Sequence, residues 1–198
     1  QMHGPTPEAA DMNTVADQLI ELLDIEQLEV DLFRGIGSGG ETTTRIFGGH
    51  VIAQALMAAY RTVPDRLCHS LHAYFIHPGD PKIPVIYQVD RARDGGSFTT
   101  RRVVAIQHGK QIFNLSASFH VDEEGWNFQH AKPQVGSPED WPNRDELREA
   151  HVAQIPKKYR DDFFRQRPLG LHEVAPRDFF TPEKASDSNH LSFRTAAP

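Results

Sequence analysis

The feature that most constrains the fold is the segment from Gly48 to Val63, which reads GGHVIAQALMAAYRTV. Its apolar residues recur at spacings of three and four, the period of a helix. His50, Gln54 and Arg61 form the one polar stripe, because steps of four and eleven residues return to nearly the same angle. A helix that is apolar almost all round has to be covered by other elements. We therefore predict a buried central helix, with its polar stripe facing a cleft or a partner rather than the sheet.

The cover for this helix is supplied by alternating apolar and polar segments on both sides of it. The segments predicted as strands are residues 28–33, 67–75, 84–89, 98–107 and 111–121. Short turns join the last four, so we expect them to be antiparallel neighbours. The predicted fold class is α+β, with one long central helix wrapped by an antiparallel sheet of about five strands.

The two ends of the chain differ in character from its middle. Residues 1–13 are polar and predict a disordered N-terminus. Residues 14–121 form the predicted domain, which opens with a short helix over 14–23. Eight of the 14 prolines lie from Pro133 onward, so residues 122–198 predict a proline-rich linker with short helices and short strands.

Composition excludes several classes of protein. No apolar run approaches the ~20 residues of a membrane span, and no signal peptide pattern opens the chain, so we expect a soluble, cytoplasmic protein. The formal net charge of -6 argues against general nucleic-acid binding. Cys68 is the single cysteine, and the eleven histidines include no HExxH spacing. We predict no metal site.

Four motifs carry a resemblance to a known family. In chain order they are LLDIEQLEVDLFRG, RIFGGHVIAQALMAAYRTVP, HSLHAYFIHPGD and RDGGSFTTRRVVAIQHGKQIFNLSASF. Together they closely resemble the amino-terminal half of the acyl-CoA thioesterase II family, from about residue 22 to residue 119. The combination is specific, whereas FGG alone would indicate little.

The resemblance implies a hotdog fold, and in the whole family protein a double hotdog built from two repeats. It implies hydrolysis of fatty acyl-CoA to free fatty acid and CoA, in lipid metabolism, with no cofactor. In the family, a catalytic Asp, Thr and Gln of the second repeat position the attacking water. This chain stops before that repeat, with only the start of a truncated copy expected, so none of the three residues is assigned here. We accordingly expect residues 1–198 alone to be inactive or slow.

The residues present could still bind the substrate. Unpaired N–H groups at the helix start, with Gly48 and Gly49 allowing close approach, suit a thioester carbonyl as negative charge develops. Equally, the glycines could serve only to let the helix begin against a crowded sheet. His50 and Glu41 are the titratable candidates for a base near this point, although contact with the sheet is the simpler role for His50.

Two further side chains are candidates. His69 is the candidate catalytic histidine, with a hydrogen-bonded core histidine as the alternative; His72 cannot pair with it, because alternation puts the two on opposite faces. Arg101 and Arg102 also point to opposite faces, and one of them is a candidate for meeting CoA phosphates. The predicted substrate-binding residues are Gly48, Gly49, His50, Gln54 and Arg101.

Two other functions stay open beside the thioesterase. The first is a non-catalytic hotdog module that binds acyl-CoA or dimerises. The second is a hotdog hydratase or dehydratase, which would need an Asp-His pair or a similar pair at the helix mouth. For any of them, a single sheet leaves an edge strand with unpaired backbone groups. We therefore expect a homo-oligomer that forms through sheet edges.

Overall fold

A computed structural model describes residues 16–37, 44–164, 168–176, 180 and 188–195. The chain forms two compact units, residues 20–127 and residues 1–19 together with 128–198. The predicted domain of residues 14–121 overlaps most of the first unit, while the predicted disordered residues 1–13 lie outside the described part of the chain. Within that described part, no helix has the length and apolar character needed to cross a membrane.

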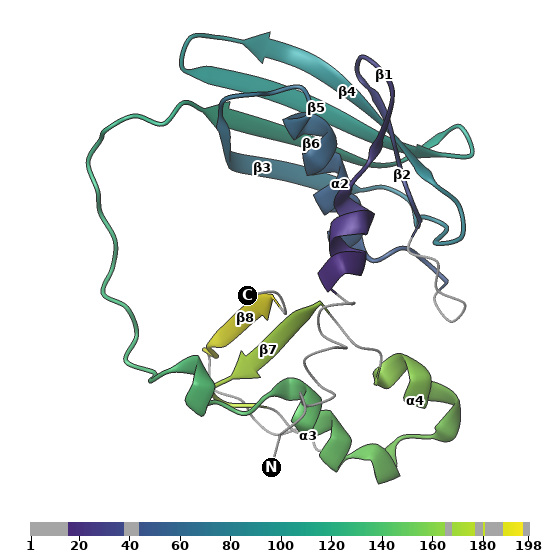
Figure 1. Ribbon diagram of the computed structural model, residues 1–198, viewed down its shortest axis with the longest axis vertical. Coiled ribbons are helices and arrows are strands. Elements are labelled where there is room, and N and C mark those ends of the chain that lie inside the picture. The colour runs from purple at the N-terminus through teal and green to yellow at the C-terminus, as the bar shows by residue number, and fades with distance from the viewer. Residues whose placement is uncertain (1–15, 38–43, 165–167, 177–179, 181–187, 196–198) are drawn as a thin grey trace, which may run out of the picture. The chain divides into compact units, whose positions relative to one another are not determined.

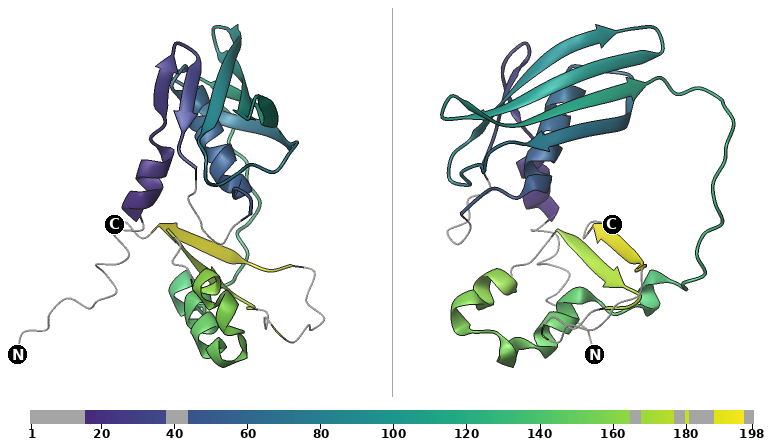
Figure 2. Two further views of the ribbon diagram at one scale, coloured as in Figure 1. Left: turned by 90° about the vertical axis from the view of Figure 1, so that its right-hand side faces the viewer. Right: turned by 180° about the vertical axis from the view of Figure 1, so that it is seen from behind.

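The first unit is a six-stranded antiparallel sheet with one helix against it (Figure 1). The helix is α2, Gly48–Tyr60, which contacts β2, β4, β5 and β6. Figure 2 shows from two further sides that α2 runs across one face of the curved sheet. In spatial order the strands are β1 (Glu26–Glu29), β2 (Leu32–Gly35), β4 (Val85–Asp94), β5 (Phe98–Gln107), β6 (Lys110–His120) and β3 (Leu67–Phe75).

Two predictions about the strands were wrong. Residues 28–33 were expected to form one strand, but Val30 and Asp31 make a turn between β1 and β2. Every residue of β1 is exposed, so the alternation of apolar and polar residues there does not mark a face packed on the core. The strand after the helix was expected to neighbour the next one in sequence. Instead β3 pairs with β6, and the connection over residues 76–84 carries the chain to β4 on the far side of β5 and β6.

Small residues let α2 approach the sheet. Ala55, Ala58 and Ala59 have no exposed surface, and they pack among the inward-facing aromatic and branched residues of the strands. The central strands supply mainly their odd-numbered residues to this core, as a pleat with a period of two requires; Ile112 is the exception, where the β5–β6 register shifts. The buried strand residues of this cluster are Phe33, Val85, Tyr87, Val89, Val103, Ala105, Ile112, Phe113, Leu115, Ala117 and Phe119.

Ala55→Leu should lower the free energy of unfolding by about 1–3 kcal/mol, because the added carbons have no space against the sheet. Ala53→Leu is the matched control, since Ala53 lies on the same helix but is only half-buried. Urea unfolding followed by circular dichroism measures both changes. Equal midpoints for Ala55→Leu and the parent chain would contradict the close packing of α2.

The described residues of the second unit form short helices and strands. Its strands β7 (Leu169–Glu173) and β8 (Leu191–Thr195) pair with each other as an antiparallel sheet. The helix α3 begins after Asn143, whose side chain accepts a hydrogen bond from the Asp145 amide and so caps it. The helical segments of this unit are η1 (Pro138–Asp140), α3 (Arg144–Ala150), η2 (Val152–Gln154) and α4 (Lys157–Phe163).

Candidate functional site

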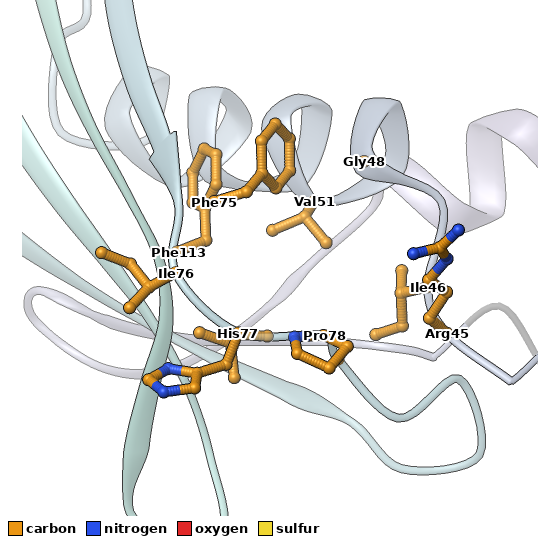
Figure 3. Close-up of a pocket in the computed structure, with 11 residues that line it drawn as sticks. Arg45, Ile46, Gly48, Val51, Phe75, Ile76, His77, Pro78 and Phe113 are labelled. Atoms are coloured by element: carbon orange, nitrogen blue, oxygen red, sulfur yellow. The ribbon is translucent and has the colours of Figure 1, made fainter.

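The start of α2 opens into a pocket of about 420 Å³, here called the helix-mouth pocket (Figure 3). Phe47 precedes the helix without a side-chain cap, and the first turn holds no acidic residue. The amides at this end are therefore available to an acceptor from outside the helix. The pocket is lined by Arg45, Ile46, Gly48, Val51, Phe75, Ile76, His77, Pro78, Gly79, Ile112 and Phe113.

Part of the wall of the helix-mouth pocket is apolar. Phe75 packs on Phe113, with ring centroids 5.1 Å apart, and its ring also lies over Gly48. A Cβ at Gly48 would lie 2.9 Å from Cζ of Phe75, so this glycine is what lets the ring approach the helix start. The sequence pattern predicts a role for Gly48 but none for Phe75, because alternation does not show which residue at the end of an edge strand lies beside the helix start.

Two side chains that are able to carry positive charge line the same pocket. Arg45 is exposed, and within the described part of the chain it has no ion pair. His77 is also exposed, and its Nδ1 donates to the Gln111 carbonyl at 3.0 Å. No carboxylate stands among the described lining residues, and Glu41, the other predicted base, lies outside the described part. The helix-mouth pocket can hold a ligand, but it shows no base beside Gly48.

His50 and Gln54 do not face this pocket. Gln54 has no exposed surface; its Nε2 donates to the carbonyls of Leu22 and Ile36, and its Oε1 accepts from Tyr87 of β4 at 2.9 Å. The polar stripe was expected to face away from the sheet. This was wrong for Gln54, its middle residue, which is bonded to Tyr87 of the sheet. The three acceptor and donor groups around Gln54 explain why a polar residue is tolerated inside the core.

His50 belongs to the same buried network. Its Nε2 donates to the Ile36 carbonyl at 3.1 Å, and burial lowers the pKa of the ring, although the hydrogen bond to Ile36 opposes that shift. His50 is 6% exposed and is not among the described residues that line the helix-mouth pocket. Together His50 and Gln54 fasten α2 to the chain that follows β2, and we assign them this structural role.

Arg101 is also built into the fold. Its side chain is 2% exposed, and all five N–H groups have acceptors inside the protein. Nε donates to Thr62 Oγ1 at 2.7 Å, while Nη2 reaches the Thr62 carbonyl and Asp94 Oδ1. Nη1 reaches the carbonyls of Arg93 and Thr100. No donor is left for a CoA phosphate, so Arg101 ties the residues after α2 to the β4–β5 turn.

The pKa of Asp94 should report on this arrangement. The hydrogen bond from Arg101 lowers the pKa of the exposed Asp94 carboxyl below its ordinary value, and Thr99 adds a weaker bond. Because the pKa of Asp94 is lower in the folded than in the unfolded protein, its bond to Arg101 stabilises the fold at pH values above the unfolded pKa. This stabilisation is lost as the pH falls through the folded pKa. Arg101→Met should raise the pKa of Asp94 in a carboxyl NMR titration, whereas Arg102→Met should leave it unchanged.

His69 lies on the outer face of the sheet, away from α2. The pairing of β3 with β6 slips between Cys68 and Ser70, and this bulge moves His69 out of the face that Leu71 and Phe75 share. The side chain is exposed, so it is not a core histidine as the alternation predicted. Its Nε2 lies 2.9 Å from Ser118 Oγ, and its ring packs on Phe98 at a centroid distance of 5.8 Å. It does not meet the helix-mouth pocket.

Comparison with known proteins indicates the family of this chain. Residues 38–120 match the family model described as the acyl-CoA thioesterase N-terminal domain. Acyl-CoA thioesterase 2 of Haemophilus influenzae is 36% identical over 185 residues, covering 93% of this chain and 64% of that protein. Acyl-coenzyme A thioesterase 8 of Mus musculus is 40% identical, covering 79% of this chain and 48% of that protein.

Solved structures agree with the sequence relatives. The crystal structure of an acyl-CoA thioesterase II, TesB2, from Mycobacterium marinum has a TM-score of 0.66 and 39% identity, covering 90% of this chain and 60% of that one. A hot dog fold protein of Alicyclobacillus acidocaldarius has a TM-score of 0.61 at 19% identity, which supports the fold alone. The chain thus spans about half to two thirds of the length of these relatives. Its sheet and α2 form a hotdog fold, and the chain belongs to the acyl-CoA thioesterase II family.

Proposed function

We propose that this chain is the amino-terminal hotdog of an acyl-CoA thioesterase, which hydrolyses fatty acyl-CoA to free fatty acid and CoA. The observation that carries the proposal is identity above 35% over most of the chain to two proteins named as acyl-CoA thioesterases. The helix-mouth pocket is compatible with it, because Gly48 lines the pocket at the uncapped start of α2, while the predicted Gly49 is not among the described lining residues. The reaction needs no cofactor, and a cytoplasmic location remains a prediction from the sequence.

Water activation, in this proposal, depends on residues beyond these 198. Thioester hydrolysis needs a base or a group that orients water next to the carbonyl. In the described part of the chain, α2 carries no carboxylate, His50 is buried, and His69 lies on the far face of the sheet. This supports a second hotdog repeat as the source of the catalytic groups, as in the family to which the motifs point.

The experiment is a thiol-release assay on the complete product of the encoding gene, with an intact mass to establish its length. Palmitoyl-CoA is the substrate, and the Haemophilus influenzae enzyme is the positive control. We expect hydrolysis by the complete product. If that product is no longer than 198 residues and releases no thiol, it is not a thioesterase.

One other function has a specific observation in its favour, namely a non-catalytic hotdog module that binds or dimerises. β3 pairs with β6 alone in the described sheet, and its free edge carries the exposed apolar side chains of Leu71 and Phe75. Such an edge recruits a partner strand. A hydratase is not favoured, because no Asp-His pair stands among the described residues at the helix mouth.

We expect residues 1–198 to self-associate through β3 at micromolar concentration, giving a two-fold pair of sheets. Sedimentation velocity over a range of concentrations measures this. A proline placed in the middle of β3, at a position whose N–H points away from β6, should abolish the dimer and leave the fold intact. The matched control places proline at Val30, in the exposed β1–β2 turn. A monomer at every concentration would contradict the expected dimer.

A further inference from the structure

We propose that the helix-mouth pocket binds the carboxylate end of a free fatty acid, so that the chain retains a product of the hydrolysis proposed above. This proposal depends on the proposed hydrolysis only as the source of the fatty acid. Its structural basis is the cavity itself, which combines apolar side chains with Arg45, the one Arg or Lys among its described lining residues.

The apolar part of the pocket matches an alkyl chain. Val51 and Phe113 are buried side chains that form its floor, while Phe75 and Ile76 are 58% and 47% exposed at its side. Exposed aromatic and aliphatic groups beside a cavity lose contact with water when an alkyl chain lies over them, which favours binding. An alkyl chain therefore has an apolar surface to lie on at this side of the pocket.

The polar part of the pocket matches a carboxylate rather than a neutral ester. Arg45 precedes the helix start by three residues, and Figure 3 shows its guanidinium on the same side of the pocket as Gly48, with Ile76 and His77 on the other side. The guanidinium fork suits a carboxylate. The uncapped helix start adds positive potential at the same end. A thioester carbonyl carries no formal charge and gains less from both groups.

No described residue that lines the pocket would repel an anion. The described lining residues include no Asp or Glu, and the first turn of α2 is free of them as well. A carboxylate beside Arg45 would have neutralised the guanidinium, and no described residue forms an ion pair with it. The charge and the apolar wall together select an amphipathic monocarboxylate.

Calorimetric titration of residues 1–198 with decanoate and with decanol tests the inference, because the two probes share an alkyl chain and differ in charge. We expect decanoate to bind at least tenfold more tightly than decanol. Arg45→Glu should weaken decanoate binding at least tenfold and change decanol binding less than twofold. Arg45→Gln should weaken decanoate binding to a smaller extent than Arg45→Glu does. This variant replaces Arg45→Glu in the test if Arg45→Glu does not fold. Ile76→Glu should weaken both probes.

Two matched controls carry the same changes at exposed sites outside the pocket. Arg102→Glu reverses a charge on the outer face of β5, and Val30→Glu places a carboxylate on an exposed apolar residue of the β1–β2 turn. Both should bind decanoate as the parent chain does. Absence of saturable binding, or equal binding of decanoate and decanol, would overturn the inference. So would equal weakening by Arg45→Glu and Arg102→Glu. None of these outcomes depends on thiol release, so the proposed hydrolysis stands or fails separately.

Discussion

Residues 1–198 assayed alone with palmitoyl-CoA should turn over about a hundredfold to ten-thousandfold below the usual enzyme median of about 10 per second. A positioned general acid or base typically accelerates a reaction by about a hundredfold to ten-thousandfold, and this acceleration is what the chain would lack. The described residues hold no such group beside Gly48, although the amides at the start of α2 remain to polarise a carbonyl. Slow turnover rather than none is therefore the expected result.

Release of CoA thiol under steady-state conditions measures this rate, and the Haemophilus influenzae relative provides the positive control. His77→Ala is the informative variant, since His77 is the one titratable group in the described pocket besides Arg45. We expect no change in the residual rate. A rate near 10 per second that His77→Ala abolishes would show that this histidine activates water and that a second repeat is not required.

Arg101→Met should lower the free energy of unfolding by about 2–4 kcal/mol. The methionine fills similar space but donates no hydrogen bond. The carbonyl and hydroxyl of Thr62 then lose their Arg101 donors in a buried position. A buried acceptor without a donor is costly, and these two lie immediately after the end of α2.

Arg102→Met is the matched control, because Arg102 is the next residue on β5 and points to solvent. It should change stability by no more than about 0.5 kcal/mol. Arg101→Lys should fall between the two, since an ammonium keeps the charge but cannot reach Thr62, Asp94 and the turn carbonyls together. Chemical denaturation of the three variants measures the difference. Equal midpoints for Arg101→Met and Arg102→Met would contradict the structural role of Arg101.

The sequence by itself determined the parts of the fold that depend on local pattern. The spacing of Val51, Ala55 and Ala59 predicts a helix over 48–63, and α2 begins at the predicted glycine. Strong alternation with β-branched residues predicts the β5–β6 hairpin within one residue at its turn, where Gly109 takes a positive φ. The four motifs predict the family, because their order and spacing hold over about half of the chain.

Only the tertiary structure decided which polar residues were available for function. A helical stripe shows that His50 and Gln54 share a face, but the partners that bury them come from Ile36 and Tyr87, which are distant in sequence. Alternation likewise cannot show a bulge, and one extra residue in β3 turned His69 to the outer face. The period of a helix or strand determines which residues share a face of that element, whereas the exposure of each side chain depends on the elements that pack against it. The positions of Arg45 and Phe75 beside the pocket therefore could not be predicted from the sequence pattern.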